Sequence, residues 1–186
     1  MRKVIVFNMV SLDGYFVDGK GDMSWAHKHD EEWNAFVSGN ASGNGTLLFG
    51  RVTYDMMASY WPSPMALKNS PAVAKGMNEM PKVVFSHTLS KASWNNTKLL
   101  KGDAADEVRK LRSEPGPDMV ILGSGKIVAH LAEHNLIDEY QLAVSPIVLG
   151  SGRTLFEGVT HKLGLKLTSS RAFGNGTVFL CYQPQG

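Results

Sequence analysis

Two glycine-containing segments directly follow short apolar runs, and each carries a cation at the start of an expected helix. They are Phe49-Gly50-Arg51 and Leu122-Gly123-Ser124-Gly125-Lys126. Glycine after a strand lets the backbone approach a ligand closely, and a helix N-terminus offers unpaired N–H groups to a phosphate. Either segment alone is more readily explained as an ordinary tight turn. The two together predict a dinucleotide bound across the carboxyl ends of parallel strands.

A third polar segment, Ser86-His87-Thr88, follows the expected strand Lys82–Phe85 and should reach the same sheet edge. Its hydroxyls and imidazole, together with Arg51, suit a phosphate on the 2′ position of a ribose. The acidic residue that would hold a free 2′-hydroxyl is absent from this strand end, which favours NADP over NAD. A plain polar strand terminus explains the segment equally well. The Gly123 segment is also an incomplete dinucleotide fingerprint, because Val128 stands where the third glycine would be.

Asp30 opens a run of three acidic residues, and two roles fit it. On a helix it shares the inward stripe with Trp33 and Val37. A carboxylate there can hold the donor edge of a pteridine or pyrimidine through two parallel hydrogen bonds and raise its protonation. The alternative is a structural role at the helix start, where acidic residues complement the helix dipole. The sequence leaves both roles open.

His130-Leu131-Ala132-Glu133-His134 matches the inverted zinc-protease pattern, in which two imidazoles share a helical face and the glutamate acts as base. Matches of five residues arise readily by chance, and the expected helix is short. We therefore expect surface histidines and no metal site here, with a metallohydrolase as the alternative.

Methionines gather in the first half of the chain. The cluster comprises Met23, Met56, Met57, Met65, Met77 and Met80. Methionine side chains are adaptable, so the cluster could line a pocket, but gap-filling core or a subunit contact is the commoner reason.

Short apolar runs alternate with helical patterns through most of the chain. The expected strands are Val4–Met9, Thr46–Phe49, Lys82–Phe85, Thr97–Leu100 and Met119–Leu122, followed by Tyr140–Val148, Leu165–Thr168 and Thr177–Tyr182. Helices are expected after Asp30 and Gly50, over Asp103–Leu111 and from Ile127 to about His134, with an irregular connection at residues 62–81. This order predicts one three-layer α/β domain, residues 1–186, with a mostly parallel sheet and an antiparallel C-terminal edge.

Composition narrows the class of partner. The chain has 186 residues, 43% of them hydrophobic, and a formal charge of only +2 without a run of lysine or arginine, so nucleic acid is not expected as a partner. Cys181 is the single cysteine, which favours a reducing compartment. The first apolar run stops at Asn8, and no stretch is long enough to span a bilayer, so we expect no membrane association and a cytoplasmic location.

Six segments of the chain occur in the same order as the motifs of a known protein family. They are Phe7–Gly14, Leu48–Tyr54, Val84–Ser86, Ile121–Gly125, Leu136–Glu139 and Pro146–Phe156. Together they resemble the dihydrofolate reductase superfamily, in the branch similar to the reductase domain of bacterial riboflavin biosynthesis. The resemblance implies a dihydrofolate-reductase-like fold, NADPH as cofactor, hydride transfer by an oxidoreductase, and a homodimer.

The resemblance and the patterns above together assign roles to particular residues. Cofactor contacts are expected from Gly50, Arg51, Thr53, Ser86, His87, Gly123, Ser124, Gly125, Lys126 and Ile127. A mobile flap is implied at Asp13–Trp25. Substrate contacts are expected from Met9, Trp25, Asp30, Gly152 and Arg153, with Asp30 as the catalytic candidate.

The implied substrate is a small heterocycle or a phosphosugar, as in reduction of 5-amino-6-(5-phosphoribosylamino)uracil, and the cationic loop Gly150–Arg153 suits a sugar phosphate. Dihydrofolate reduction is an alternative. Against it, Ala143 stands where a threonine usually partners the carboxylate, and no arginine lies near Pro81–Lys82 to bind a glutamate tail. A second alternative is an NADP-binding module without turnover.

Overall fold

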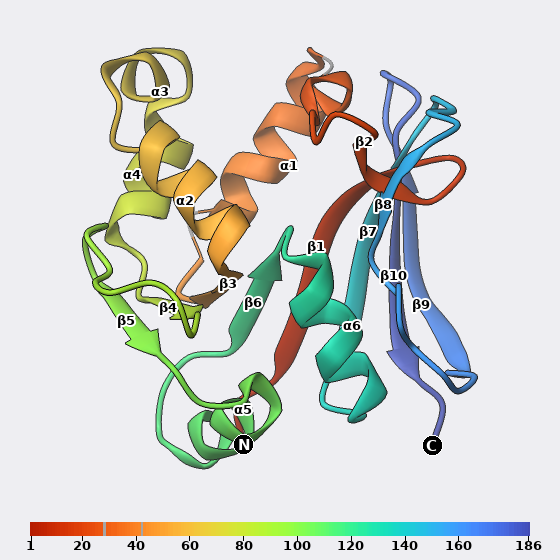
Figure 1. Cartoon of the computed structure of the whole chain (residues 1–186). Helices are drawn as coiled ribbons and strands as arrows, with labels where there is room; N and C mark the ends of the chain where they lie inside the picture. The colour runs from red at the N-terminus through yellow and green to blue at the C-terminus, as the bar shows by residue number, and fades with distance from the viewer. Residues whose placement is uncertain (28, 42) are drawn as a thin grey trace.

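The computed structural model describes residues 1–27, 29–41 and 43–186. In this part of the chain, eight strands form one sheet in the order β5-β4-β3-β6-β1-β7-β10-β9, and β2 pairs with β8 in a second sheet (Figure 1). The strands are β1 (Val4–Ser11), β2 (Tyr15–Asp18), β3 (Thr46–Gly50), β4 (Lys82–Phe85), β5 (Thr97–Leu100), β6 (Met119–Leu122), β7 (Glu139–Ser145), β8 (Gly152–Thr154), β9 (Leu165–Ala172) and β10 (Val178–Pro184). The helices are η1 (Ser24–Ala26), α1 (Glu31–Ala41), α2 (Arg51–Tyr60), α3 (Pro64–Asn69), α4 (Pro71–Glu79), α5 (Ala104–Ser113) and α6 (Gly125–Glu133).

The main sheet is parallel from β5 to β7 and antiparallel at its C-terminal edge. β3 lies parallel between β4 and β6, and β1 lies parallel between β6 and β7. β10 then runs antiparallel to both β7 and β9. The predicted α/β fold, with a mostly parallel sheet and an antiparallel C-terminal edge, is confirmed. Its parallel part brings the ends of β3, β4 and β6 to one edge.

Helices pack on both faces of the sheet because successive strand residues point to opposite sides. Val6 of β1 packs in one buried cluster with Val108 of α5 and Leu131 of α6. Phe49 of β3 packs in another cluster with Met77 of α4. The result is the expected three layers, with α5 and α6 on one face and α1, α2 and α4 on the other (Figure 1).

Two segments differ from the sequence-based expectation. Residues 62–81, expected to be irregular, contain α3 and α4, each of which begins with a proline, Pro64 or Pro71. Proline suits the first helical position because its missing N–H would be unpaired there anyway. The expected flap loop contains β2, whose pairing with β8 joins segments more than a hundred residues apart. Among the described residues, no helix has the length and apolar character needed to cross a membrane.

Lys82, the first residue of β4, is a buried cation that is 1% exposed. Its ammonium donates to the carbonyls of Asn78 (3.1 Å), Met80 (2.7 Å) and Asn95 (3.0 Å), and it lies 4.5 Å from the centre of a ring of Trp94. Burial lowers the pKa of Lys82 to about 8. The side chain ties the end of α4 to the turn before β5, so it fixes the helix that carries Met77 and the residue that follows it, Met80.

Candidate functional site

The starts of α2 and α6 meet at the carboxyl edge of the sheet. The Gly50 N–H donates to Ser124 Oγ at 3.0 Å, and the Ser124 N–H donates to Thr53 Oγ1 at 3.0 Å. These two bonds cross-link the helix that begins with Arg51 to the loop that precedes Lys126. Both helix starts therefore present backbone N–H groups and a cation on the same side of the protein.

Asn8 of β1 fixes the same loop from the other side. Its Oδ1 accepts the Gly123 N–H at 2.9 Å, and its Nδ2 donates to the Gly123 carbonyl at 3.2 Å. Gly123 has φ +56°, and a Cβ there would lie 2.9 Å from Thr53 Cγ2. A Cβ at Gly125 would lie 2.7 Å from a ring carbon of Phe16. These glycines are thus required by the tight packing of the loop, as the tight-turn explanation has it, and their contact with a ligand stays a prediction.

The residues predicted to hold a 2′-phosphate lie near the start of α2. Arg51 donates from Nη1 to Thr88 Oγ1 and forms a 3.4 Å ion pair with Asp55, while its side chain stays 47% exposed. Ser86 is buried, and its Oγ accepts the N–H groups of Thr88 and Leu89. Thr88 belongs to the segment whose hydroxyls were expected at this phosphate, and its contact with Arg51 could not be read from the sequence. The arrangement leaves an accessible guanidinium beside a polar turn.

The segment expected to be a flap is tied to the loop after β7 through Asp13. This carboxylate accepts the Ser11 hydroxyl at 2.6 Å and the N–H groups of Gly150 (2.8 Å) and Leu149 (3.1 Å). The hydrogen bond from Ser11 and those from the two backbone N–H groups lower the pKa of Asp13 from 3.8 to about 2. Ionised Asp13 therefore anchors the turn that leads into β2.

Acid should release this anchor. Because the pKa of Asp13 is lower in the folded protein than in the unfolded chain, its stabilisation is complete above pH 4 and is lost as the pH falls toward 2. We expect Asp13→Asn to unfold with a shallower dependence of Tm on pH between 4 and 2 than the wild type. Differential scanning calorimetry measures this. Glu114→Gln, which alters an exposed carboxylate just after α5, should keep the wild-type slope, and the same slope in Asp13→Asn would contradict the assignment.

A small cavity of about 270 Å³ lies beside the start of α6. It is lined by Phe16, Gly125, Lys126, Arg153, Thr154 and Glu157. The Arg153 guanidinium lies 5.6 Å from the centre of the Phe16 ring. Arg153 was predicted to contact substrate together with Gly152. Within the described residues, Arg153 lines this small cavity and neither residue lines the large one.

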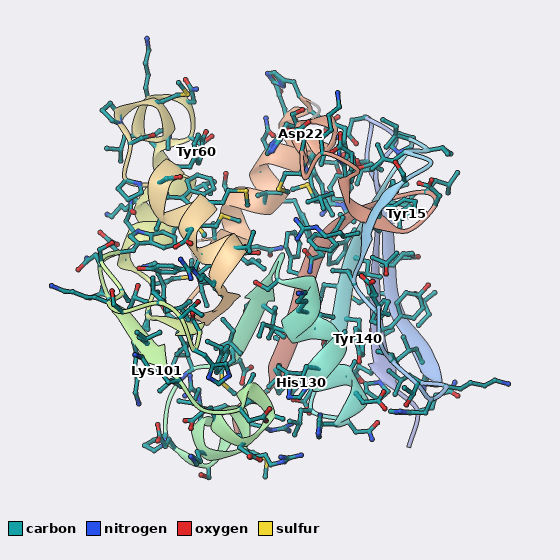
Figure 2. All side chains as sticks on the ribbon, in the orientation of Figure 1. Tyr15, Asp22, Tyr60, Lys101, His130 and Tyr140 are labelled. Atoms are coloured by element: carbon teal, nitrogen blue, oxygen red, sulfur yellow. The ribbon has the colours of Figure 1, made fainter. Side chains whose placement is uncertain are left out.

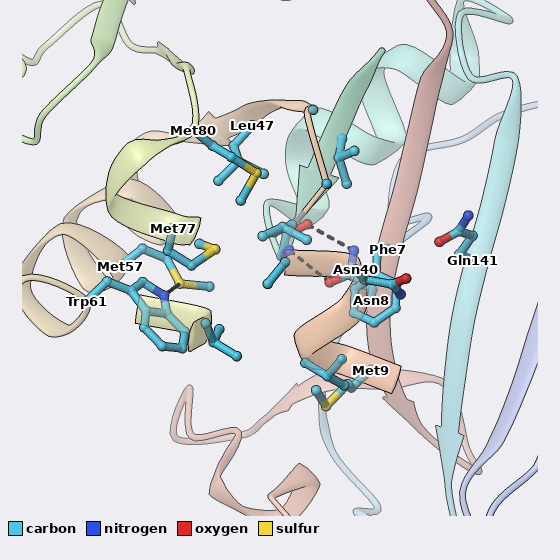
Figure 3. A pocket seen from close by; sticks show the side chains of 18 of the residues that line it. Phe7, Asn8, Met9, Asn40, Leu47, Met57, Trp61, Met77, Met80 and Gln141 are labelled. Atoms are coloured by element: carbon cyan, nitrogen blue, oxygen red, sulfur yellow. Dashed lines mark hydrogen bonds between the residues drawn. The ribbon is translucent and has the colours of Figure 1, made fainter. Parts of the chain in front are cut away.

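A much larger cavity of about 880 Å³ lies between α1 on one side and α2 and α4 on the other, over β1, β3 and β6 (Figure 3). Met9, predicted to contact substrate, lines it, as do Asn8 and Gly123 from the loop described above. Tyr60 of α2 and Asp22 lie on opposite sides of the gap between these elements (Figure 2). The large cavity thus begins where the start of α6 is held and extends away from it.

Asp30 acts at the start of α1 and is not among the described residues that line the large cavity. Its Oδ1 accepts the Trp33 N–H at 2.7 Å, and its carbonyl accepts the Asn34 N–H. This is the helix-start role that the sequence left open as the alternative. Trp25 is half-buried, donates its indole N–H to the Asp22 carbonyl, and is likewise absent from the described lining. A substrate contact for either residue stays a prediction.

The histidine motif on α6 has other partners. His130 Nε2 lies 2.8 Å from Asp103 Oδ2, and Glu133 accepts the N–H and hydroxyl of Thr160. In the part of the chain that the structure describes, no three histidine, cysteine or acidic side chains are placed to hold a metal ion. His130 also lies low on α6, away from the end where that helix begins (Figure 2). The structure therefore gives no support to the metallohydrolase alternative.

Comparison with known proteins defines the family to which this chain belongs. The model of the RibD C-terminal domain family matches residues 2–179, so this chain belongs to that family. The resemblance inferred from the six motifs is thereby confirmed.

Solved structures agree with this assignment at the level of the fold. A putative riboflavin biosynthesis protein from Shewanella sp. PV-4 is 24% identical, with a TM-score of 0.76 and 99% of each chain covered. A diaminohydroxyphosphoribosylaminopyrimidine deaminase/5-amino-6-(5-phosphoribosylamino)uracil reductase from Thermotoga maritima is 15% identical, with a TM-score of 0.70, and the match covers 99% of this chain and 57% of that one. Dihydrofolate reductase from Enterococcus faecalis, solved with NADP(H), is 12% identical, with a TM-score of 0.67 and 99% and 97% covered.

Proposed function

We propose that this protein is an NADPH-dependent reductase that transfers hydride to a small molecule, within the range of heterocycles and phosphosugars. The observation that carries the proposal is the pair of cross-linked helix starts, each with a cation, next to a cavity large enough for a substrate. Family membership supports an oxidoreductase, because the family is that of the riboflavin-pathway reductase domain.

The residues at the helix starts fit the charge of this cofactor. Arg51, Ser86 and the exposed His87 would hold the 2′-phosphate, with Thr88 orienting the Arg51 guanidinium. The first N–H groups of α6 with Lys126 would hold the pyrophosphate. Gly123 and Gly125 let this loop pack closely against Thr53 and Phe16, which holds it in place at the start of α6. NADPH supplies the hydride when it is bound. The chain would position the substrate over β1, and the apolar lining would keep bulk water from the reacting atoms. A water molecule at the cavity mouth would supply the proton.

Titration separates this proposal from its alternatives. We expect the nicotinamide fluorescence of NADPH to change on binding, and NADH to bind at least about tenfold more weakly because it lacks the 2′-phosphate. Steady oxidation of NADPH, followed at 340 nm across a panel of uncharged and phosphorylated carbonyls and heterocycles, is expected with some of them. Binding without oxidation by any member of the panel would favour the NADP-binding module, and failure of NADPH to bind would overturn the proposal.

We further propose a cytoplasmic homodimer. The edge strand β9 is exposed over nearly its whole length, including Leu167 at 49%, and an exposed strand edge is a ready surface for pairing. Light scattering of the intact protein measures its mass in solution and so tests the homodimer, which the mass of a single chain would contradict.

A further inference from the structure

The floor of the large cavity is an apolar sheet surface that no helix fully covers. Along β1, Val4, Val6 and Val10 are buried against the other face, whereas Ile5, Phe7 and Met9 are only half-buried. Ile5, Phe7 and Met9 all line the cavity. A central strand with one buried face and one half-buried apolar face leaves hydrophobic surface for a ligand to cover.

The rest of the cavity is rich in soft and aromatic side chains, to which Met9 of the floor also contributes. The methionines are Met9, Met23, Met56, Met57, Met77 and Met80. Tyr60 and Trp61, at the end of α2, complete this part of the lining. The Trp61 indole N–H donates to the Met57 sulfur at 3.0 Å (Figure 3). Sulfur is a weak acceptor, so a ligand carbonyl or ring nitrogen would be a better partner for this N–H.

The charges of the cavity do not suit an anion. Among the lining residues that the structure describes, the ionisable groups are His27, Tyr60 and Asp118, and there is neither lysine nor arginine. A phosphate in this cavity would lose its water without gaining a cation, which is strongly unfavourable. The cations of the site region lie outside this cavity. Arg51 and Lys126 lie at the helix starts that suit the cofactor, and Arg153 lines the small cavity beside the start of α6.

We propose that the large cavity binds an uncharged, flat, predominantly apolar substrate that carries a carbonyl or ring-nitrogen acceptor and no phosphate. This rests on the proposed reductase function and narrows its substrate class, because it excludes the phosphosugars. The division of charge is the reason: the helix starts bind the phosphates of the cofactor, and the methionine-lined cavity binds an apolar body.

A matched pair of probes tests the proposal without any turnover. 1-Naphthol and 1-naphthyl phosphate share one flat ring system and differ in the phosphate. Isothermal titration of the full chain, with no nicotinamide cofactor present, should show naphthol binding at least about tenfold more tightly than naphthyl phosphate at the same site. Absence of naphthol binding, or naphthyl phosphate of equal affinity that naphthol displaces, would overturn the proposal.

A pair of variants locates the binding. Met56 lines the cavity and is 42% exposed, so lysine is tolerable there, whereas Met65 on α3 is 64% exposed and not among the described lining residues. Met56→Lys should weaken the binding of naphthol about tenfold and strengthen the binding of naphthyl phosphate. Met65→Lys should change neither affinity. Equal effects of the two variants would contradict the assigned site.

The two proposals fail in different ways. If NADPH does not bind but naphthol does, and responds to Met56→Lys, the reductase function is wrong and the cavity assignment stands. If NADPH binds and is oxidised with a phosphorylated substrate that naphthol displaces, the function stands and the apolar substrate class is wrong.

Discussion

Replacing Arg51 with glutamine is expected to weaken NADPH binding by about 10- to 100-fold while changing NADH binding by less than about twofold. A hydrogen bond to a charged group contributes about 1.5–3 kcal/mol, which corresponds to that range of affinity. The 2′-phosphate is the part of NADPH that NADH lacks, so a loss confined to NADPH identifies the group that Arg51 binds. Fluorescence titration of both nucleotides on the same protein preparation measures the ratio directly.

The hydrogen bond from Arg51 to Thr88 provides the control for this result. Thr88→Val removes the acceptor that orients the guanidinium and leaves the charge in place. We expect Thr88→Val to weaken NADPH binding by only about threefold, because the charge of Arg51 still attracts the phosphate. If Arg51→Gln weakens the binding of NADPH and NADH equally, Arg51 acts instead through the shape of the α2 start. Unchanged NADPH affinity would remove Arg51 from the site altogether.

The parallel part of the fold and the two helix starts were predictable because their signals are local. A strand buried on both faces reads as a short continuous apolar run, as Leu47–Phe49 does, and its end is marked by Gly50 and Arg51. Once such strands alternate with helices, parallel pairing brings their carboxyl ends together. The meeting of Gly50 with Ser124 therefore follows from the topology, although the hydrogen bonds themselves do not.

The pairing of β2 with β8 was not predictable from local pattern. It depends on Gly152, where a Cβ would lie 2.0 Å from the Val17 carbonyl oxygen, and on Asp13, which holds the N–H groups of Leu149 and Gly150. Both contacts join residues more than 130 positions apart. A glycine-rich segment by itself gives no sign of which distant backbone it will approach.

For Asp30, helical spacing does not predict the direction of the side chain. The spacing of three and seven to Trp33 and Val37 holds only for residues inside the helix, and α1 begins at Glu31. One position earlier the backbone is no longer helical, and a short carboxylate turns back to the free N–H of Trp33. The methionine cluster was likewise ambiguous, because the same residues fill a core or line a cavity. Whether helices cover a sheet face is decided by tertiary packing.

The second large effect is expected at Lys82. Lys82→Met keeps the length and apolar stem of the side chain but leaves the carbonyls of Asn78, Met80 and Asn95 without their donor. Removing one partner from a buried charged network typically costs about 3 kcal/mol, because the remaining polar groups stay out of water. We expect the midpoint of denaturant unfolding to fall accordingly, with an unchanged m-value.

A matched substitution shows whether this effect belongs to the buried ammonium. Lys98 lies on the neighbouring strand β5 and is exposed, so Lys98→Met should change the free energy of unfolding by less than about 0.5 kcal/mol. Lys82→Met should also weaken 1-naphthol binding. Lys82 holds the end of α4, and Met77 and Met80 there line the large cavity. A Lys82→Met protein as stable as the wild type would mean that the three carbonyls find other donors, and that this wall of the cavity is held by packing alone.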